Sequence, residues 1–197
     1  MRTSFTLVSL LSIFLAFVII YECPADETAS SGYEKSWTIQ MGQIFGDLKA
    51  RNGDDLNMTI VMMRFGFPLN HHLGLAKHKG KVTFFVEPFL GPTWTPDNDV
   101  VLGAPLFLEY SYPLSEKFSL HTGFGAGPSY FGVDTVEEGS GGFEFFDSAS
   151  AGFRYRMNQD HYLTVEYRGI HISDLHMNSP NNGVDAYGFF FGLSSQF

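Results

Sequence analysis

The sequence predicts an all-β protein, an eight-stranded antiparallel transmembrane β-barrel of the outer membrane of a Gram-negative cell. Three observations indicate this fold class. The 197-residue chain is 44% hydrophobic and rich in Phe and Gly, yet its mean hydropathy is −0.01. After an apolar N-terminal run, apolar and polar side chains alternate in segments of about ten residues, the length of a membrane-spanning strand. No later segment keeps a helical period over three or four turns.

The composition also excludes several classes of protein. Disordered chains are poor in aromatic residues and rich in charge, whereas this chain is 16% aromatic and 17% charged. A single Cys cannot form a disulfide framework. A net charge of −9 argues against a nucleic-acid partner, because phosphate binding needs clustered Lys and Arg. One domain is expected for this length.

Residues 1–25 are expected to form a cleaved export signal. The apolar run 5–20 follows the basic start at Arg2, and its 16 residues are fewer than the ~20 that a membrane-spanning helix needs. Cleavage after Ala25 removes the only Cys and leaves 26–197 as the barrel domain. Acylation of Cys23 is the alternative, but Glu22 directly before it fits a lipid-attachment site poorly.

Eight segments are expected to be strands, because their apolar side chains fall on one face and their small or polar ones on the other. In chain order they are 37–43, 57–67, 81–91, 102–111, 118–127, 148–156, 163–168 and 187–197. The alternation is weak in the first three and regular in the other five. The last strand shows it best, with Tyr187, Phe189 and Phe191 opposite Gly188 and Gly192.

The fourth to seventh strands follow the same rule. Their apolar faces carry, in order, Leu102, Ala104, Leu106, Leu108 and Tyr110; Phe118, Leu120, Thr122, Phe124 and Ala126; Ala149, Ala151, Phe153 and Tyr155; and Leu163, Val165 and Tyr167. The opposite faces carry mainly glycines, serines and charged residues. A period of two therefore gives each strand two unlike surfaces.

The charged face distinguishes a membrane barrel from a soluble one. A soluble barrel turns its bulky apolar residues inward, whereas a membrane barrel turns them toward lipid and keeps polar groups inside. The polar faces here carry Glu87, Glu109, His121, Arg154, Arg156, Glu166 and Arg168. Three carboxylates and three guanidiniums would form a balanced plug in a narrow interior. A terminal aromatic residue, Phe197, also favours an outer-membrane barrel.

An even number of strands places both termini at the periplasmic end. The short connections 112–117 and 157–160 are then periplasmic turns, and 46–56, 92–99, 133–142 and 175–184 are outer loops. The connection 68–80 is longer than a usual periplasmic turn and contains His71, His72 and His78. Solvated histidines are the preferred interpretation there, and a metal site is the alternative.

Candidate catalytic residues lie at the end of the seventh strand. His171 and Ser173 are two residues apart and share a face, and an antiparallel return brings Asp185 beside them. A serine nucleophile needs a base and a group that orients the base. This face is the lipid-facing one, where a polar group near the interface costs roughly 1 kcal/mol or less. The spacing alone leaves open that these are ordinary residues of the barrel rim.

The motif itself resembles that of the PagL-type lipid A 3-O-deacylases, outer-membrane acyl hydrolases. The matching elements are His171-Ile172-Ser173-Asp174, then Pro180-Asn181-Asn182-Gly183, then Asp185 at the opening of the last strand. The resemblance implies Ser173 as nucleophile, His171 as general base and Asp185 as the acid that orients the base. The family more often has Glu at this last position.

One residue departs from the family pattern. Where the family has Asn as an oxyanion donor, this chain has Asp174, which cannot donate when ionised. Loss of one oxyanion donor can cost on the order of a hundredfold in rate. Asp174 therefore lies in the expected oxyanion region, and its replacement of Asn is expected to lower the rate of hydrolysis.

The resemblance implies ester hydrolysis of an acyl chain on lipid A (lipopolysaccharide) in the outer leaflet, with no metal and no cofactor. The expected partners are lipid A and outer-membrane lipid, and a homodimer is left open. The outer loops are acidic although lipid A is anionic, which keeps a phospholipase as a second interpretation. A non-enzymatic structural barrel is the third.

Overall fold

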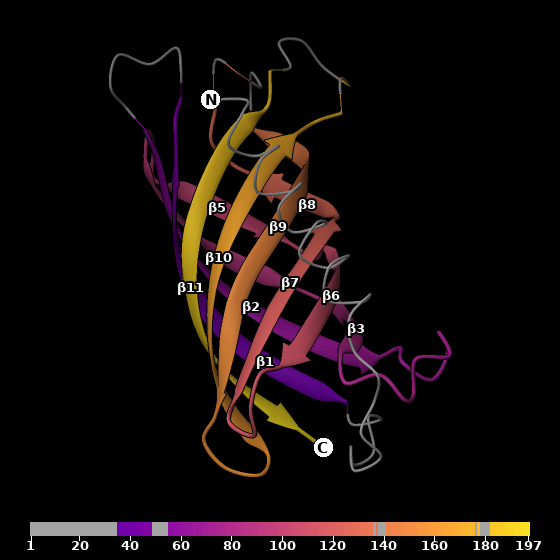
Figure 1. Ribbon diagram of the computed structural model, residues 1–197. Helices are drawn as coiled ribbons and strands as arrows, with labels where there is room; N and C mark the ends of the chain where they lie inside the picture. Colours follow the sequence, from indigo (N-terminus) through magenta and orange to yellow (C-terminus); the bar gives the residue numbers. More distant parts are fainter. Residues whose placement is uncertain (1–34, 49–54, 136, 138–140, 176, 178–181) are drawn as a thin grey trace.

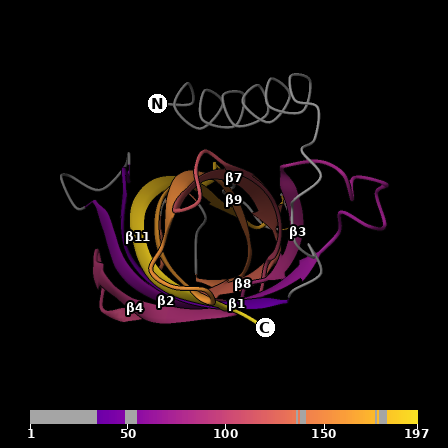
Figure 2. The same ribbon diagram turned by 60° about the horizontal axis from the view of Figure 1, so that its bottom comes forward.

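The computed structural model describes residues 35–48, 55–135, 137, 141–175, 177 and 182–197, and these residues form one closed antiparallel sheet (Figure 1). The order around the ring is β1, β11, β10, β9, β7, β6, β3 and β2, and β1 pairs with β2 to close it (Figure 2). The predicted eight-stranded antiparallel barrel is therefore confirmed. The described residues contain no helix that is long and apolar enough to cross a membrane.

Three of the eight barrel strands are each divided into two segments, so that the sheet has eleven labelled strands. Their bounds are β1 (Ser36–Gly46), β2 (Leu56–Pro68), β3 (Lys81–Val86), β4 (Phe89–Thr95), β5 (Asp99–Gly103), β6 (Leu106–Pro113), β7 (Phe118–Ala126), β8 (Pro128–Phe131), β9 (Gly142–Arg156), β10 (His161–Ser173) and β11 (Val184–Gln196). The divided strands are β3 with β4, β5 with β6, and β7 with β8. Each of the eight segments expected from the alternation overlaps one barrel strand; the expected segments 81–91 and 102–111 cross a division, and two others extend one residue past the strand end.

A proline lies at each division: Pro88, Pro105 and Pro128. Proline has no N–H and so interrupts a ladder of backbone hydrogen bonds. The breaks lie side by side, because Glu87 N–H donates to the Pro105 carbonyl at 3.0 Å and Ala104 N–H donates to the Pro128 carbonyl at 3.1 Å. Side chains keep the same inward and outward alternation across each break.

The two ends of the barrel differ. At the terminal end, Phe197 N–H donates to the Lys35 carbonyl at 3.0 Å, so the start of β1 and the end of the chain meet there. The connections 69–80, 114–117 and 157–160 lie at the same end. The other end of the barrel is called the loop end. The connections between strands at this end are 47–55, 96–98, 132–141 and 174–183. The second of these is shorter than expected because β4 continues to Thr95. The expected export signal lies outside the described residues.

The outer surface is apolar and aromatic, as the alternation predicted. Large hydrophobic side chains exposed on the strands include Trp37, Ile39, Met41, Phe65, Leu90, Phe124, Phe153, Phe189, Phe191 and Leu193. Such a continuous exposed surface is unsuited to water and matches the lipid-facing band of a membrane barrel.

The inner surface near the loop end is also apolar, which differs from the expected interior of small and polar residues. Buried side chains from several strands form one cluster there: Ile44, Leu48, Leu56, Met58, Ile60, Met62, Phe89, Val101, Phe131, Val133, Phe146, Ile170, Ile172, Val184, Ala186 and Phe190. In β2, Leu56, Met58, Ile60 and Met62 all point inward and are 0% exposed. The loop-end half of the barrel therefore has a packed hydrophobic core as well as an apolar exterior.

An ionic plug fills the middle of the barrel. It consists of Arg64, Arg154, Arg168, Glu87, Glu109 and Glu166. Glu87 accepts from Arg64 Nε at 2.5 Å and from Arg168 Nη1 at 2.7 Å. Glu109 accepts two bonds of 2.7 Å from Arg154. The plug contains three carboxylates and three guanidiniums, as predicted, but one of the three arginines differs from the prediction.

Arg64 belongs to the ionic plug, whereas the sequence predicted Arg156 in its place. Arg64 lies in β2, where the weak alternation concealed its inward position, and it bonds to all three glutamates. Arg156 lies nearer the terminal end and donates to the carbonyls of the 157–160 turn at 3.1 Å. The guanidinium of Arg64 also lies 4.2 Å from the centre of the Phe85 ring, a cation–π contact that supports it away from water.

Replacing Arg168 with Met should lower the free energy of unfolding by about 3–5 kcal/mol, because buried Glu87 and Glu166 would each lose a neutralising partner. Urea-induced unfolding of the refolded barrel in lipid vesicles measures this. Arg156→Met is the matched control, since its guanidinium donates to backbone carbonyls of the turn. A loss for Arg168→Met no larger than that of the control would contradict the role assigned to the plug.

Candidate functional site

The structure brings His171 and Asp185 together on the outside of the barrel. The two residues are direct partners in the antiparallel pairing of β10 with β11. His171 Nδ1 donates to Asp185 Oδ1 at 2.7 Å. Their side chains are 30% and 31% exposed, so the pair is neither in bulk solvent nor in the core. This bond holds the imidazole in one orientation and makes Nε2 the nitrogen that can accept a proton.

Ser173 is the last residue of β10, two positions beyond His171 toward the loop end. Strand alternation places it on the same outer face, at about 6.6 Å of Cα separation along the strand. It pairs with Phe145 of β9 and is only 5% exposed. The serine is therefore sheltered by its neighbours although it lies on the outer face.

The lipid-facing side of the same strands continues below the site. Tyr167 and Phe189 are paired residues whose ring centres lie 5.1 Å apart, and Tyr187 pairs with Gly169. The three polar side chains thus lie at the loop-end border of an aromatic surface. This is the position that the sequence pattern predicted for them.

Asp147 flanks His171 on its other side, and the sequence analysis missed it. It is the residue of β9 that pairs with His171, and alternation directs it to the outer face between Phe145 and Ala149. Directly opposite residues on paired strands have Cβ atoms about 4.5–5.5 Å apart. The signal was present in the sequence, because Asp147 is the one carboxylate on an otherwise apolar face of that strand. His171 therefore lies between two carboxylates.

Gly183 packs against the His171 ring. Its φ is +68°, in the left-handed region that favours glycine. A Cβ added there would lie 2.7 Å from His171 Nε2 and closer still to Cε1. The preceding residue is held in place, since Asn182 N–H donates to the Glu137 carbonyl at 2.9 Å. Because glycine has no Cβ, position 183 has room for the imidazole of His171.

Asp174, the expected oxyanion residue, is 1% exposed. Its burial agrees with the inner face, to which alternation assigns the residue after Ser173. Its carbonyl accepts from Met177 N–H at 3.2 Å, and Leu175 between them has a φ of +56°. The chain thus turns sharply just beyond the serine.

An apolar depression of about 480 Å³ begins beside Asp147 on the outer surface. Its walls come from β3, β6, β7 and β9 and include Phe84, Leu108, Phe124 and Ala149. It reaches Leu106 and Ala126, which lie beside the strand divisions at Pro105 and Pro128. The depression offers a surface for a hydrocarbon chain within one strand of His171.

Among the described residues, one group has the geometry of a metal site: Glu109, His121 and Glu166 in the barrel interior. The carboxylates of this group already accept hydrogen bonds from Arg64, Arg154 and Arg168. Three guanidiniums around the same oxygens disfavour a further cation. The group is therefore part of the plug.

Comparison with known proteins relates the chain to outer-membrane proteins. A family model described as lipid A 3-O-deacylase (PagL) matches residues 26–194. No curated protein matches the chain. The barrel is similar to the structure of Neisserial surface protein A, with 12% identity and a TM-score of 0.63 over 83% of this chain and 97% of that one.

Two further structures share the barrel. The outer membrane enzyme PagL is 14% identical with a TM-score of 0.54, covering 78% of this chain and 97% of that chain. Ail, the attachment invasion locus protein of Yersinia pestis, is 13% identical with a TM-score of 0.50, covering 85% and 100%. Identities this low establish the fold alone.

Replacing Gly183 with Ala should displace the His171 ring and lower the free energy of unfolding by about 1–2 kcal/mol, the cost of a left-handed non-glycine residue. Gly74→Ala is the matched control, because Gly74 has a φ of +70° but an added Cβ there would meet nothing within 4 Å. NMR of the imidazole carbon and proton resonances reads the ring directly. Equal resonance changes in both variants would contradict a specific contact between Gly183 and His171.

Proposed function

Because the chain belongs to the PagL family of lipid A 3-O-deacylases, we propose that it is a serine esterase that removes an ester-linked acyl chain from lipid A in the outer leaflet. The protein is an outer-membrane protein of a Gram-negative bacterium. The observation that carries the proposal is the 2.7 Å bond between His171 and Asp185 on the lipid-facing side, with Ser173 two residues further along the same face.

In this proposal His171 acts as a general base. Asp185 accepts a hydrogen bond from the Nδ1–H and so keeps the imidazole in the tautomer whose Nε2 can take the Ser173 proton. Ser173 Oγ attacks the ester carbonyl, and the tetrahedral intermediate collapses to an acyl-enzyme. His171 gives its proton to the departing sugar oxygen, which leaves as a hydroxyl group. Water, deprotonated by His171, then releases the fatty acid and restores the serine.

The position of the site supports a lipid substrate. A site on the outer face is open to the bilayer, so an acyl chain can reach it without leaving an apolar environment. The depression beside Asp147 provides such an environment next to the imidazole. With both termini on the periplasmic side, as expected for an even number of strands, the loop end carries the site to the outer leaflet, where lipid A is found.

Asp174 affects the expected rate. The family motif has Asn at this position as an oxyanion donor, and an ionised Asp accepts rather than donates hydrogen bonds. Asp174 is buried, whereas the backbone beyond it turns through Leu175 with a φ of +56°. We propose the backbone N–H of Leu175 as the oxyanion donor, because the N–H of Met177 already donates to the Asp174 carbonyl, and we propose Asp174 as a structural residue of this turn.

Expression of the chain in a Gram-negative host of known lipid A structure should remove one ester-linked hydroxyacyl chain, and Ser173→Ala should abolish that change. Mass spectrometry of extracted lipid A measures both. The matched control is Ser195→Ala, because Ser195 lies on the outer face of β11 opposite His161, at the far end of the barrel.

The other outcomes identify the alternative functions. Unchanged lipid A together with release of fatty acid from phospholipid would replace the deacylase with a phospholipase. No change in either lipid would favour a barrel without enzymatic activity. Equal loss of activity in both serine variants would remove Ser173 from the role of nucleophile.

Comparison of Asp185→Asn with Asp147→Asn should show which carboxylate orients the base. Asp185 makes the 2.7 Å bond to Nδ1, so its amide should lower kcat by a factor on the order of a thousand or more. Asp147 pairs with His171 through the backbone ladder, and its amide should lower kcat by less than about tenfold. Initial rates on purified lipid A in micelles measure the two effects, and a larger loss for Asp147→Asn would reverse the assignment.

A further inference from the structure

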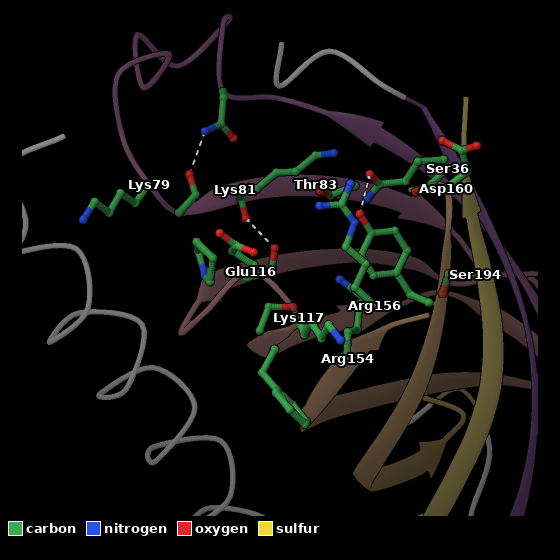
Figure 3. A pocket seen from close by; sticks show the side chains of 18 of the residues that line it. Ser36, Lys79, Lys81, Thr83, Glu116, Lys117, Arg154, Arg156, Asp160 and Ser194 are labelled. Carbon is green, nitrogen blue, oxygen red and sulfur yellow. Dashed lines mark hydrogen bonds between the residues drawn. The ribbon is translucent and has the colours of Figure 1, made fainter. Parts of the chain in front are cut away.

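The terminal end of the barrel opens into a cavity of about 620 Å³, called the vestibule here (Figure 3). Its walls come from β1, β3, β6, β7, β9, β10, β11 and the three connections at this end. Its inner limit is Arg154, whose guanidinium bonds to Glu109 of the ionic plug. The vestibule is therefore a pocket with a closed floor, on the far side of the plug from the apolar core.

The vestibule is basic although the protein is acidic. Among the described residues, five of the nine Lys and Arg line it, but only two of the 15 Asp and Glu do. The cations are Lys79, Lys81, Lys117, Arg154 and Arg156, and the acids are Glu116 and Asp160. The other described residues include four Lys and Arg and 13 Asp and Glu. Like charges gathered in a concave site with low-dielectric walls raise the local concentration of counter-ions.

The long connection 69–80, which the sequence analysis could not account for, helps to build this site. Asn70 fixes the connection to the start of β3, since its Nδ2 donates to the Gly80 carbonyl at 2.8 Å and its Oδ1 accepts from Val82 N–H at 2.7 Å. The fold of the connection places Lys79, His71 and His78 on the wall of the vestibule. The long connection therefore forms part of the vestibule wall at the terminal end of the barrel.

The cations come from different segments but line one space, as Figure 3 shows. Lys81 begins β3, Lys117 lies in the 114–117 turn, and Arg156 ends β9. Arg156 donates to two neutral carbonyls, which leaves its charge without a carboxylate partner among the described residues. Hydroxyl groups of Ser36, Thr38 and Ser194 add further polar groups to the walls.

We propose that the vestibule binds a small phosphate-bearing anion. Ammonium and guanidinium groups around a concave site form the strong, charge-assisted hydrogen bonds that phosphate oxygens accept. The closed floor and the volume suit a compact headgroup or free phosphate compound rather than a polymer. Since the vestibule lies at the opposite end from His171, its ligand has no part in the proposed hydrolysis.

Isothermal titration calorimetry tests this with the full chain refolded in zwitterionic micelles at low ionic strength. Sodium pyrophosphate is the first probe, and short-chain phosphatidylglycerol against phosphatidylcholine is the second. Saturable binding is expected for at least one of the two probes. Binding of pyrophosphate alone would identify the ligand as a soluble anion, and binding of phosphatidylglycerol would identify it as a lipid headgroup. Lys81→Gln with Lys117→Gln should weaken binding by about tenfold for each charge removed.

Lys77→Gln is the matched control, because Lys77 is exposed on the same connection but does not line the vestibule. Its affinity should equal that of the unaltered protein. Circular dichroism confirms that all variants retain the barrel. No saturable binding of either probe, or equal weakening by the control and the double variant, would overturn the proposal. Lipid A hydrolysis should be the same in all variants, so failure here is separate from failure of the proposed esterase.

Discussion

Closure of the sheet is the constraint on which the rest of this structure depends. In a bilayer, each unpaired backbone N–H or carbonyl costs several kcal/mol, so a sheet must close on itself. Here β1 pairs with both β11 and β2 and leaves no edge in the ring. Closure also gives every residue of a strand only two directions, into the barrel or toward lipid. The outward position of His171, Ser173 and Asp185 follows from this choice.

The closed interior is divided into three levels that serve different purposes. An apolar core fills the loop-end half, the ionic plug fills the middle, and the vestibule opens at the terminal end. The plug is buried charge, which is stable only when its hydrogen bonds are satisfied. Arg64 meets this need by bonding to Glu87, Glu109 and Glu166 at once. The plug therefore lies between the apolar core and the vestibule.

The shape of the barrel does not identify the function of this protein. Neisserial surface protein A has a higher structural similarity to it than the enzyme PagL does, with TM-scores of 0.63 and 0.54. Barrel shape therefore says little about activity, since function depends on sites placed on a fold. The family match and the His171–Asp185 bond are the observations that support the proposed hydrolase. Asp147, Gly183 and the apolar depression form the surroundings of His171, the proposed base.

The sequence by itself determined the strands, their two faces and the residues of the candidate triad. Period-two alternation is a local property, so Tyr187, Phe189 and Phe191 could be assigned to lipid without knowledge of any partner strand. Only the tertiary structure decided which strands face each other and at what register. The sequence placed Asp185 near His171 across one loop, but the pairing of His171 with Asp147 and the place of Arg64 in the plug depend on that register. The gathering of cations in the vestibule depends on it as well. Register is set by contacts between residues far apart in the chain, and one segment read alone does not contain them.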